Sequence, residues 1–291
     1  MPRIAYVNGR YVPHAHAQVG IEDRGYQFAD GVYDVVPIMR GTFIDEDWHW
    51  DRLDRGLAEM RIDWPVSRKA LSMICHRVAE TNMIKDGIVY VQVTRGEAPR
   101  NHAFPKSPVP PALVVTARHL AMPDDLAEAR MIDVITGPDE RWARPNIKTI
   151  ALLPNILSKQ MASEAGAYET WLMNDKGEIT EGTSANAWIV YRDDKGQVTL
   201  QTHQSDQAIL KGIIRTAIVE LAEKHQWAIL EKPFTRDELL AADQAFQSSS
   251  GNMIRVVRTV DGQTIGDGKT GPVMQEILDA FAAHVEAQLP S

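Results

Sequence analysis

The 291-residue sequence contains very little cysteine, and this scarcity limits its chemistry. Its single cysteine, Cys75, cannot form a disulfide within the chain, which favours a reducing compartment. The surrounding stretch LSMICHRVAE has apolar residues at helical spacing. We therefore expect Cys75 to be a small core residue rather than a catalytic thiol, and we expect a cytoplasmic location.

Long apolar runs and clusters of one charge sign are also missing. No stretch is long enough to span a bilayer, and the start of the sequence, MPRIAYVNGRYV, lacks the basic residues and apolar run of a signal peptide. The formal net charge is -8, with both signs spread along the chain and no basic stripe. We expect no membrane and no nucleic-acid partner, and no motif in the sequence predicts a metal site.

The residues that are present predict a mixed α+β or α/β fold with two domains. The composition, 44% apolar and 24% charged, is ordinary for a globular chain. Residues 1–120 combine a hairpin around Asn8-Gly9 with further strands and two amphipathic helices, which predicts a small α+β domain. A polar segment with a proline at 121–128 is the expected linker. Residues 129–291 predict a larger, β-rich domain with helices.

Several local signals are specific enough to place single elements. Ser67 is a plausible helix cap, and Thr235 with Glu238 forms a capping-box pattern. Asp175-Lys176-Gly177 predicts the turn of one hairpin, and NAWIVYRDDKGQVTLQT predicts a second hairpin. A final helix is expected after Pro272.

Lys148 is the first candidate for chemistry. It lies in RPNIKTIALLPNILSKQMASEAG, beside an apolar run, and burying a lysine there is costly because desolvation opposes its charge. Partial burial would lower the pKa of the amine and make its neutral form available to attack an aldehyde. A surface lysine whose stem covers apolar neighbours is the alternative, and this stretch taken alone favours it.

Two segments have the composition of a phosphate site. Leu210-Lys211-Gly212-Ile213-Ile214 leads into a helix, where free backbone N–H groups bind anions and a glycine lets a ligand come close. Ser249 and Ser250, followed by Gly251, offer hydroxyls and amides. Taken alone, the first segment is more simply an ordinary junction, and a polar turn explains the second equally well.

Glu181 precedes a turn of small residues in EITEGTSANAWIV. Its carboxylate is either exposed or paired with a protonated ring nitrogen of a ligand. Asn186, five residues on, is suited to hold the turn through side-chain bonds to the backbone.

Together these segments resemble the fold-type IV pyridoxal-phosphate enzymes over nearly the whole chain. Their pattern is a glutamate, a serine-or-alanine pair, an asparagine, a hairpin, L-x-T, and a helix start ending in Gly-Ile-x-Arg. It stands here as Glu181-Gly-Thr-Ser-Ala-Asn186, Leu200-Gln-Thr202 and Leu210-Lys-Gly212-Ile213-Ile214-Arg215. The group includes D-amino acid aminotransferases, branched-chain aminotransferases and aminodeoxychorismate lyases.

The resemblance is closest to the D-amino acid (D-alanine) aminotransferases. EDRGYQFADGVYDVV carries Tyr33 at the position of their active-site tyrosine, and HWDRL places Arg52 at their phosphate-binding arginine. IKTIALLPNILSKQ places Lys148 at their cofactor lysine. VTRGEAPRNHAFP looks like the segment that traps the substrate carboxylate, through Arg100 and His102.

The resemblance implies pyridoxal 5'-phosphate as the cofactor. Lys148 would form a Schiff base with it and, once freed by the substrate, move a proton between the substrate Cα and the cofactor C4′. Glu181 would keep the pyridine nitrogen protonated. Leu210 would lie against the ring. The phosphate would be held by Arg52, Gly212, Ile213, Ile214, Ser249 and Ser250.

The same resemblance implies a substrate site shared between two subunits. Arg100 and His102 are two apart, so on an extended segment they share a face. With the Tyr33 hydroxyl they would bind an α-carboxylate, and in the family this segment enters the active site of the other subunit of a homodimer. Val35 faces the same way as Tyr33 and would line the side-chain pocket. Without the other motifs, Arg100, His102 and Tyr33 would be three unrelated surface residues.

The predicted function is a transaminase that moves the amino group between D-amino acids, such as D-alanine and D-glutamate, and 2-oxo acids by a ping-pong mechanism. One alternative is a branched-chain L-aminotransferase, which would share Lys148 and Glu181 but is not expected to carry Arg100-Asn101-His102. Another is an aminodeoxychorismate lyase. An inactive pyridoxal-phosphate carrier ranks last, because every reactive position is present.

Two positions depart from the family pattern. Trp188 stands where phenylalanine or tyrosine is usual, and we expect it to pack in the same way. Ile214 stands where the D-amino acid enzymes often have threonine, which removes one hydroxyl from the phosphate site. We expect weaker retention of the cofactor and unchanged chemistry.

Overall fold

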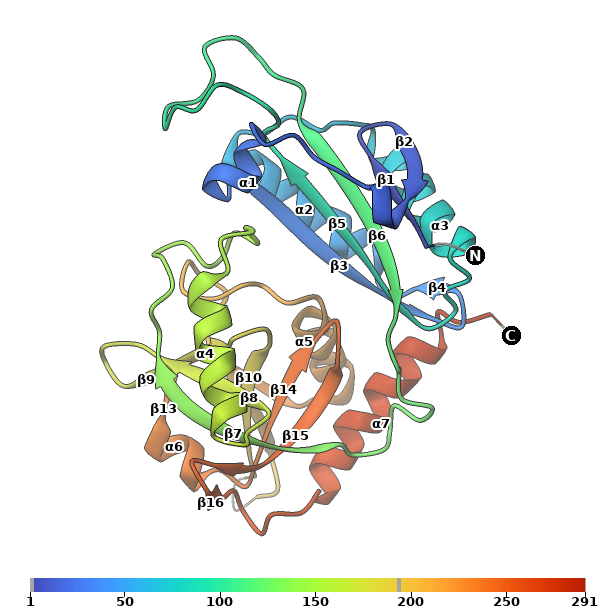
Figure 1. The fold of residues 1–291 in the computed structure, drawn as a ribbon. Helices are drawn as coiled ribbons and strands as arrows, with labels where there is room; N and C mark the ends of the chain where they lie inside the picture. Colours follow the sequence, from blue (N-terminus) through green and yellow to red (C-terminus); the bar gives the residue numbers. More distant parts are fainter. Residues whose placement is uncertain (1–2, 193–194, 291) are drawn as a thin grey trace. The chain divides into compact units, whose positions relative to one another are not determined.

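The computed structural model describes residues 3–192 and 195–290 (Figure 1). Contacts divide the chain into two compact units. The first comprises Met1–Met122, Ile147–Ala151 and Leu289–Ser291, and the second comprises Pro123–Asn146 and Leu152–Gln288. The sequence pattern kept 147–151 with the C-terminal part of the chain. The structure assigns this segment to the first unit because it pairs with a strand there.

The first unit contains a six-stranded antiparallel sheet in the order β2-β1-β6-β5-β3-β4. Asn8 and Gly9 have φ values of 44° and 91°, as a tight hairpin turn requires, and Val7 lies opposite Arg10. The predicted hairpin is therefore confirmed. The strands are β1 (Ile4–Val7), β2 (Arg10–Pro13), β3 (Gly31–Met39), β4 (Thr42–Phe43), β5 (Gly87–Thr94) and β6 (Ala112–His119).

Helices α2 (Glu46–Met60) and α3 (Arg68–Thr81) pack on one face of this sheet (Figure 1). Trp50, Leu53 and Leu57 of α2 enter a common core with the inward side chains of β3, β5 and β6. Cys75 of α3 is fully buried in that core, as expected. Ser67 accepts a hydrogen bond from the backbone N of Ala70 at 3.2 Å, which confirms the predicted cap. Two short helices, η1 (His14–His16) and α1 (Arg24–Phe28), precede β3.

The second unit contains a mixed sheet in the order β12-β11-β10-β14-β15-β7-β8-β9-β13, with β16 beside β15. Pairing is parallel between β7 and β8, β7 and β15, and β11 and β12. Its core contains Trp171, Ile179 and Phe234. The strands are β7 (Met131–Pro138), β8 (Glu169–Met173), β9 (Glu178–Gly182), β10 (Asn186–Arg192), β11 (Val198–Thr202), β12 (Ala228–Glu231), β13 (Phe234–Thr235), β14 (Gln244–Ser249), β15 (Met253–Val260) and β16 (Gln263–Thr264).

Within the described residues, four helices complete the second unit: α4 (Leu153–Glu164), α5 (Ile213–His225), α6 (Arg236–Ala241) and α7 (Pro272–Glu286). Thr235 and Glu238 form the predicted capping box at α6, and Pro272 begins the predicted last helix. Gly177, at φ 77°, turns the first predicted hairpin. The strands of the second pair as predicted, whereas part of its turn, residues 193–194, lies outside the described residues.

The predicted mixture of α and β structure is confirmed. In the part of the chain that the structure describes, no helix has both the length and the apolar character that crossing a membrane requires.

Candidate active site

Lys148 is held against β3 by backbone hydrogen bonds. The N–H of Tyr33 donates to the carbonyl of Lys148 at 3.0 Å, and the N–H of Ile150 donates to Gly31 at 3.2 Å. The half-buried Lys148 side chain places its Nζ 4.3 Å from the centre of the Tyr33 ring. Two of the predicted residues, 115 positions apart in the chain by their numbers, are thus brought together. The face of the Tyr33 ring has a partial negative potential, which attracts the Lys148 side chain in its charged form.

Tyr33 belongs to a row of half-buried side chains on the sheet face that α2 and α3 leave uncovered. Val35, two residues along β3, has the same orientation. The Tyr33 ring stacks on Tyr90 with centroids 5.4 Å apart, and the Tyr90 hydroxyl donates to Gln92 at 2.7 Å. Burial, with Tyr33 adding to it, raises the pKa of Tyr90 well above its usual range. Tyr90 and Gln92 were missed in the sequence, although the alternation in GIVYVQVT placed both on one face.

Arg52 projects from α2 into a buried cluster. Its Nε and Nη2 donate to the two carboxylate oxygens of Asp34 at 2.8 and 2.7 Å, and His49 Nδ1 lies 2.6 Å from the same carboxylate. Burial opposes ionisation of Asp34, but the charges of Arg52 and His49 outweigh it and hold the pKa of that carboxyl far below its usual range. Asp34 and Tyr33 are successive residues of β3 and point to opposite faces. The structure therefore ties Arg52 firmly to Asp34, a partner that the sequence did not reveal.

Arg100 and His102 gather around Phe28. The Arg100 guanidinium lies 4.5 Å from the centre of the Phe28 ring, and the His102 ring meets Phe28 edge-on at 5.5 Å. Arg24 fixes their backbone, with hydrogen bonds of 2.6 Å to the Asn101 carbonyl and 3.4 Å to that of His102. The predicted pair thus shares one face and is exposed. Among the contacts of the described residues, none joins either side chain to Tyr33.

In the second unit, Glu181 lies at the end of β9 and is 4% exposed. Its Oε1 accepts from the backbone N of Leu210 at 3.0 Å and from Arg141, and its Oε2 accepts from Asn186 at 2.9 Å. Burial raises the pKa of the Glu181 carboxyl, while Arg141 and the Leu210 N–H oppose the rise. Arg141 was missed because nothing in its local sequence indicates a partner 40 residues away.

Asn186 lies beside the two segments that have the composition of a phosphate site, residues 210–214 and 249–251. Its amide nitrogen also donates to the Leu210 carbonyl at 2.9 Å, and a Cβ at Gly212 would lie only 2.1 Å from its amide oxygen. Gly212 is the residue before α5 and provides no side-chain cap, which leaves N–H groups at the helix start for an anion. Across the sheet, Asn186 lies opposite Ser248, next to Ser249 and the turn at Ser250.

The two positions that depart from the family pattern are both buried. Trp188 stacks on Phe246 with centroids 5.4 Å apart and donates to the Ser248 hydroxyl at 3.0 Å, so the expected packing is confirmed. The Ile214 side chain is 1% exposed and faces the core, whereas its backbone N–H belongs to the first turn of α5.

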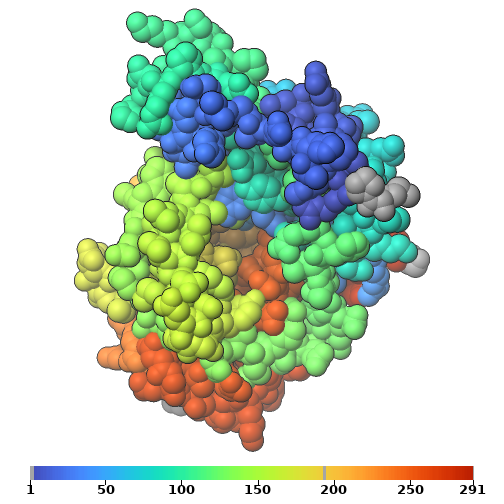
Figure 2. Space-filling model, viewed as in Figure 1, coloured from blue at the N-terminus to red at the C-terminus, as the bar shows by residue number. Residues whose placement is uncertain are grey.

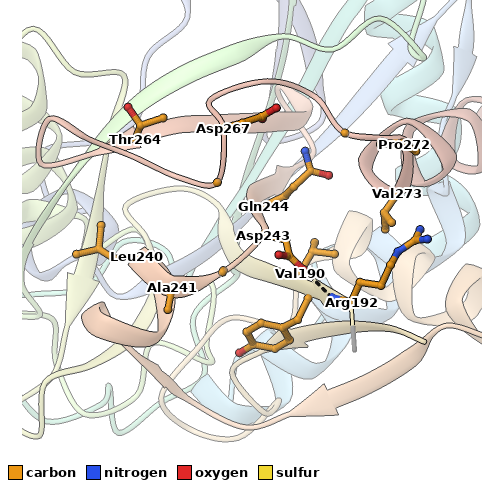
Figure 3. A pocket seen from close by; sticks show the side chains of 14 residues that line it. Val190, Arg192, Leu240, Ala241, Asp243, Gln244, Thr264, Asp267, Pro272 and Val273 are labelled. Atoms are coloured by element: carbon orange, nitrogen blue, oxygen red, sulfur yellow. Dashed lines mark hydrogen bonds between the residues drawn. The ribbon is translucent and has the colours of Figure 1, made fainter. Parts of the chain in front are cut away.

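A cavity of about 710 Å³ elsewhere in the second unit contains none of the predicted residues (Figure 3). Polar side chains that line it form hydrogen bonds with other groups of the same chain. Asp243 accepts from the backbone N of Arg192 at 2.7 Å, and Gln244 donates to the Lys269 carbonyl at 3.0 Å and accepts from the Met274 N–H at 3.2 Å. We therefore do not assign the predicted chemistry to this cavity.

The chain is similar to known proteins along its whole length. The profile of the Amino-transferase class IV family matches residues 31–260. A D-alanine aminotransferase of Bacillus licheniformis is 38% identical over 274 residues, 94% of each chain, and one of Listeria innocua is 37% identical over 96% of this chain and 95% of its own. The crystal structure of the Escherichia coli branched-chain amino acid aminotransferase superposes with a TM-score of 0.89 at 22% identity, covering 100% of this chain and 97% of that one.

Proposed function

Because the chain belongs to the class IV aminotransferases, we propose that it transfers amino groups between D-amino acids, including D-alanine and D-glutamate, and 2-oxo acids. The observation that carries this proposal is its identity of 37–38% with D-alanine aminotransferases over nearly the whole of each chain. The exposed pair Arg100 and His102, gathered on one face, supports it as a carboxylate trap. The close likeness to a branched-chain enzyme is a likeness of fold, at 22% identity.

The residues present fit pyridoxal 5'-phosphate, which we propose as the cofactor. Lys148 offers a half-buried amine, and Glu181 offers a buried carboxylate. The uncapped start of α5 offers N–H groups beside a glycine that cannot be replaced without a collision. When bound, this cofactor supplies an aldehyde carbon and a ring that withdraws electrons from the substrate Cα.

We assign each side chain a role from its chemistry and surroundings. The Lys148 amine would hold the cofactor and move the Cα proton. The Glu181 carboxylate would pair with the ring nitrogen, and Leu210, whose N–H donates to Glu181, would offer an apolar contact to the ring. The amides of Gly212, Ile213 and Ile214 and the hydroxyls of Ser249 and Ser250 would hold the phosphate, and the family resemblance adds Arg52 to them. Tyr33, Arg100 and His102 would bind the α-carboxylate, and Val35 would line the side-chain pocket.

The proposed enzyme is a homodimer, and α4 supports this. Leu153, Ile156, Leu157 and Met161 of α4 are between 42% and 66% exposed. They recur at intervals of three and four residues and form one stripe, while Ser158 and Ala162 face the sheet. The helix thus turns its large apolar residues outward, and α4 lies at the surface in Figure 2. Such a stripe is typical of a surface that a second chain covers. We propose the cytoplasm as the compartment, consistent with a single, buried cysteine.

One spectroscopic experiment tests the reaction. The protein loaded with pyridoxal phosphate is mixed with single D- and L-amino acids, and the cofactor absorption band is followed. We expect D-alanine, but not L-leucine, to convert the band to that of the pyridoxamine form. Lys148→Ala is the control, because it lacks the amine that moves the proton and should not give the band of the pyridoxamine form.

One alternative predicts another outcome of this experiment, and the other is tested by an assay with aminodeoxychorismate as the substrate. Conversion by branched L-amino acids alone would replace the proposal with a branched-chain aminotransferase, the function named for the superposed structure. Release of one pyruvate per aminodeoxychorismate would assign the chain to the lyases instead.

A further inference from the structure

Glu181 belongs to a largely buried group of three charged side chains in the second unit. Asp139 directly follows β7, and Arg141 lies two residues beyond it. Arg141 Nε donates to Asp139 Oδ1 at 2.8 Å and Nη2 donates to Oδ2 at 2.7 Å, which is a two-point contact. The other terminal nitrogen, Nη1, donates to Glu181 Oε1. Arg141 therefore lies between two carboxylates and contacts each with a different edge.

The position of Arg141 is fixed on several sides. Its Nη2 also approaches the Ala208 carbonyl at 3.2 Å and the Thr180 hydroxyl at 3.3 Å. Thr180 in turn donates to Asp139 at 2.7 Å, and the Asp139 N–H donates to the Met173 carbonyl at 2.9 Å. The side chains of Arg141 and Glu181 are each only 6% exposed. With this anchoring, the guanidinium reaches only one oxygen of Glu181.

The charges of this group do not cancel. Two carboxylates and one guanidinium leave one net negative charge when all three are ionised. Burial opposes ionisation of Asp139, but Arg141 outweighs it, so the pKa of Asp139 is lowered. The pKa of Glu181 is raised, by burial above all and by the nearby charge of Asp139 in part. Glu181 thus lies beside an arginine and still lacks a full positive partner.

One oxygen of Glu181 remains able to accept. Oε1 is occupied by Arg141 and by the Leu210 N–H, whereas the donor that Oε2 contacts among the described residues is Asn186 at 2.9 Å. A carboxylate oxygen accepts about two hydrogen bonds. A donor that carries a positive charge would complete both the hydrogen bonding and the charge of the group.

We propose that Asp139 is a positioning residue that keeps Glu181 effective as a counter-ion. By engaging Arg141 through both of its oxygens, Asp139 balances the guanidinium charge, and Glu181 can then pair with a protonated aromatic nitrogen at Oε2. Without Asp139, Arg141 would neutralise Glu181 and the pair would carry no net charge. This inference rests on the proposed pairing of Glu181 with the cofactor ring.

Cofactor affinity tests the inference without measuring turnover. The cofactor-free protein is titrated with pyridoxal phosphate and with its 1-deaza analogue, in which a C–H replaces the ring nitrogen, and tryptophan fluorescence reports binding. The ratio of the two dissociation constants measures how strongly the protein favours the ring nitrogen. We expect Asp139→Asn to reduce this preference by about tenfold, because one net charge is lost beside Glu181.

A double variant separates charge from structure. Asp139→Asn with Arg141→Gln removes one charge of each sign and leaves Glu181 with its single negative charge, so the preference should return towards that of the wild type. A purely structural role would predict further loss. Asp261→Asn is the matched control, because Asp261 also binds an arginine in the same unit, Arg236 Nε at 2.8 Å, and among the described residues neither of the two contacts Glu181.

The outcomes distinguish two failures. If the wild type does not prefer the ring nitrogen, the proposed role of Glu181 is wrong and the inference falls with it. If the wild type prefers the ring nitrogen and Asp139→Asn shows the same preference, the proposed role of Asp139 is refuted and that of Glu181 stands. Circular dichroism checks that Asp139→Asn is folded. If it is not, the double variant alone decides, because a preference well below that of the wild type would overturn the proposal.

Discussion

At Gly212, one added methyl group would collide with the side chain that also holds Glu181. An alanine Cβ would lie 2.1 Å from Asn186 Oδ1, and Asn186 is buried with hydrogen bonds to Glu181 and Leu210. We expect Gly212→Ala to lower the free energy of unfolding by about 1–3 kcal/mol and to weaken cofactor binding, because both the helix start and the asparagine must shift. Urea denaturation and a titration with pyridoxal phosphate measure the two effects.

Gly251→Ala is the matched control for that substitution. At Gly251 no atom lies within 4 Å of the position of an added Cβ, so the change should leave the free energy of unfolding nearly unaltered. A Gly212→Ala protein that binds the cofactor as tightly as the wild type would contradict the assignment of Gly212 to the phosphate site.

Single residues also show where sequence analysis stops. Glu181 and Gly212 were predicted because they lie in a compact motif. Asp139 and Asp34 were not, because their importance depends on groups brought near by folding: Glu181 on the other side of Arg141, and Arg52 from α2. A pattern along the chain reveals which groups are reactive, whereas the groups that orient them become apparent only in the fold.

At the scale of elements, local signals predicted local structure. The Asn8-Gly9 turn, the Ser67 cap and the Thr235–Glu238 box each act within four residues, and each is present. The pairing of 147–151 with β3 and the position of β7 between β8 and β15 were not predictable, because they depend on distant segments. The first of these pairings is the one that sets Lys148 against Tyr33.

The contact between α2 and α3 gives a prediction about pH. Glu46 of α2 accepts from His76 Nε2 at 3.0 Å and from Ser72 at 2.6 Å, both on α3. The hydrogen bond to Glu46 raises the pKa of His76, although burial opposes it. The stabilisation is therefore fully present below the pKa of an unfolded histidine and is lost as the pH rises through the raised value.

His76→Gln should consequently destabilise the protein more near about pH 6 than near about pH 9. The His76 side chain is 41% exposed, so solvent screening keeps the difference below about 1 kcal/mol. Urea unfolding at the two pH values measures it. Arg77→Gln, on the next residue of α3, does not change charge in this range and should show no such difference. An equal loss for His76→Gln at both pH values would refute the assignment.

At the scale of the whole molecule, the fold and the function are supported by different observations. The chain superposes on a branched-chain enzyme with a TM-score of 0.89, yet it is 22% identical to that enzyme and 38% identical to a D-alanine aminotransferase. A shared fold thus leaves the substrate open, and in the proposed function selectivity would depend on side chains such as Arg100 and His102. In the proposed dimer those two residues would act in the active site of the partner subunit, and activity would then require assembly.

The outward stripe of α4 makes this condition testable. Ile156 is 61% exposed at the middle of the stripe, and a lysine there would place a charge in any interface that covers it. We expect Ile156→Lys to be folded but monomeric in sedimentation and to lose most of its activity, because each active site would lack the Arg100 and His102 of the partner. Met73→Lys is the control, since Met73 is 65% exposed on α3, outside the stripe, and the variant should remain dimeric. A monomeric Ile156→Lys protein with full activity would show that the active site is complete within one chain, and an Ile156→Lys protein that stays dimeric would exclude the α4 stripe as the interface.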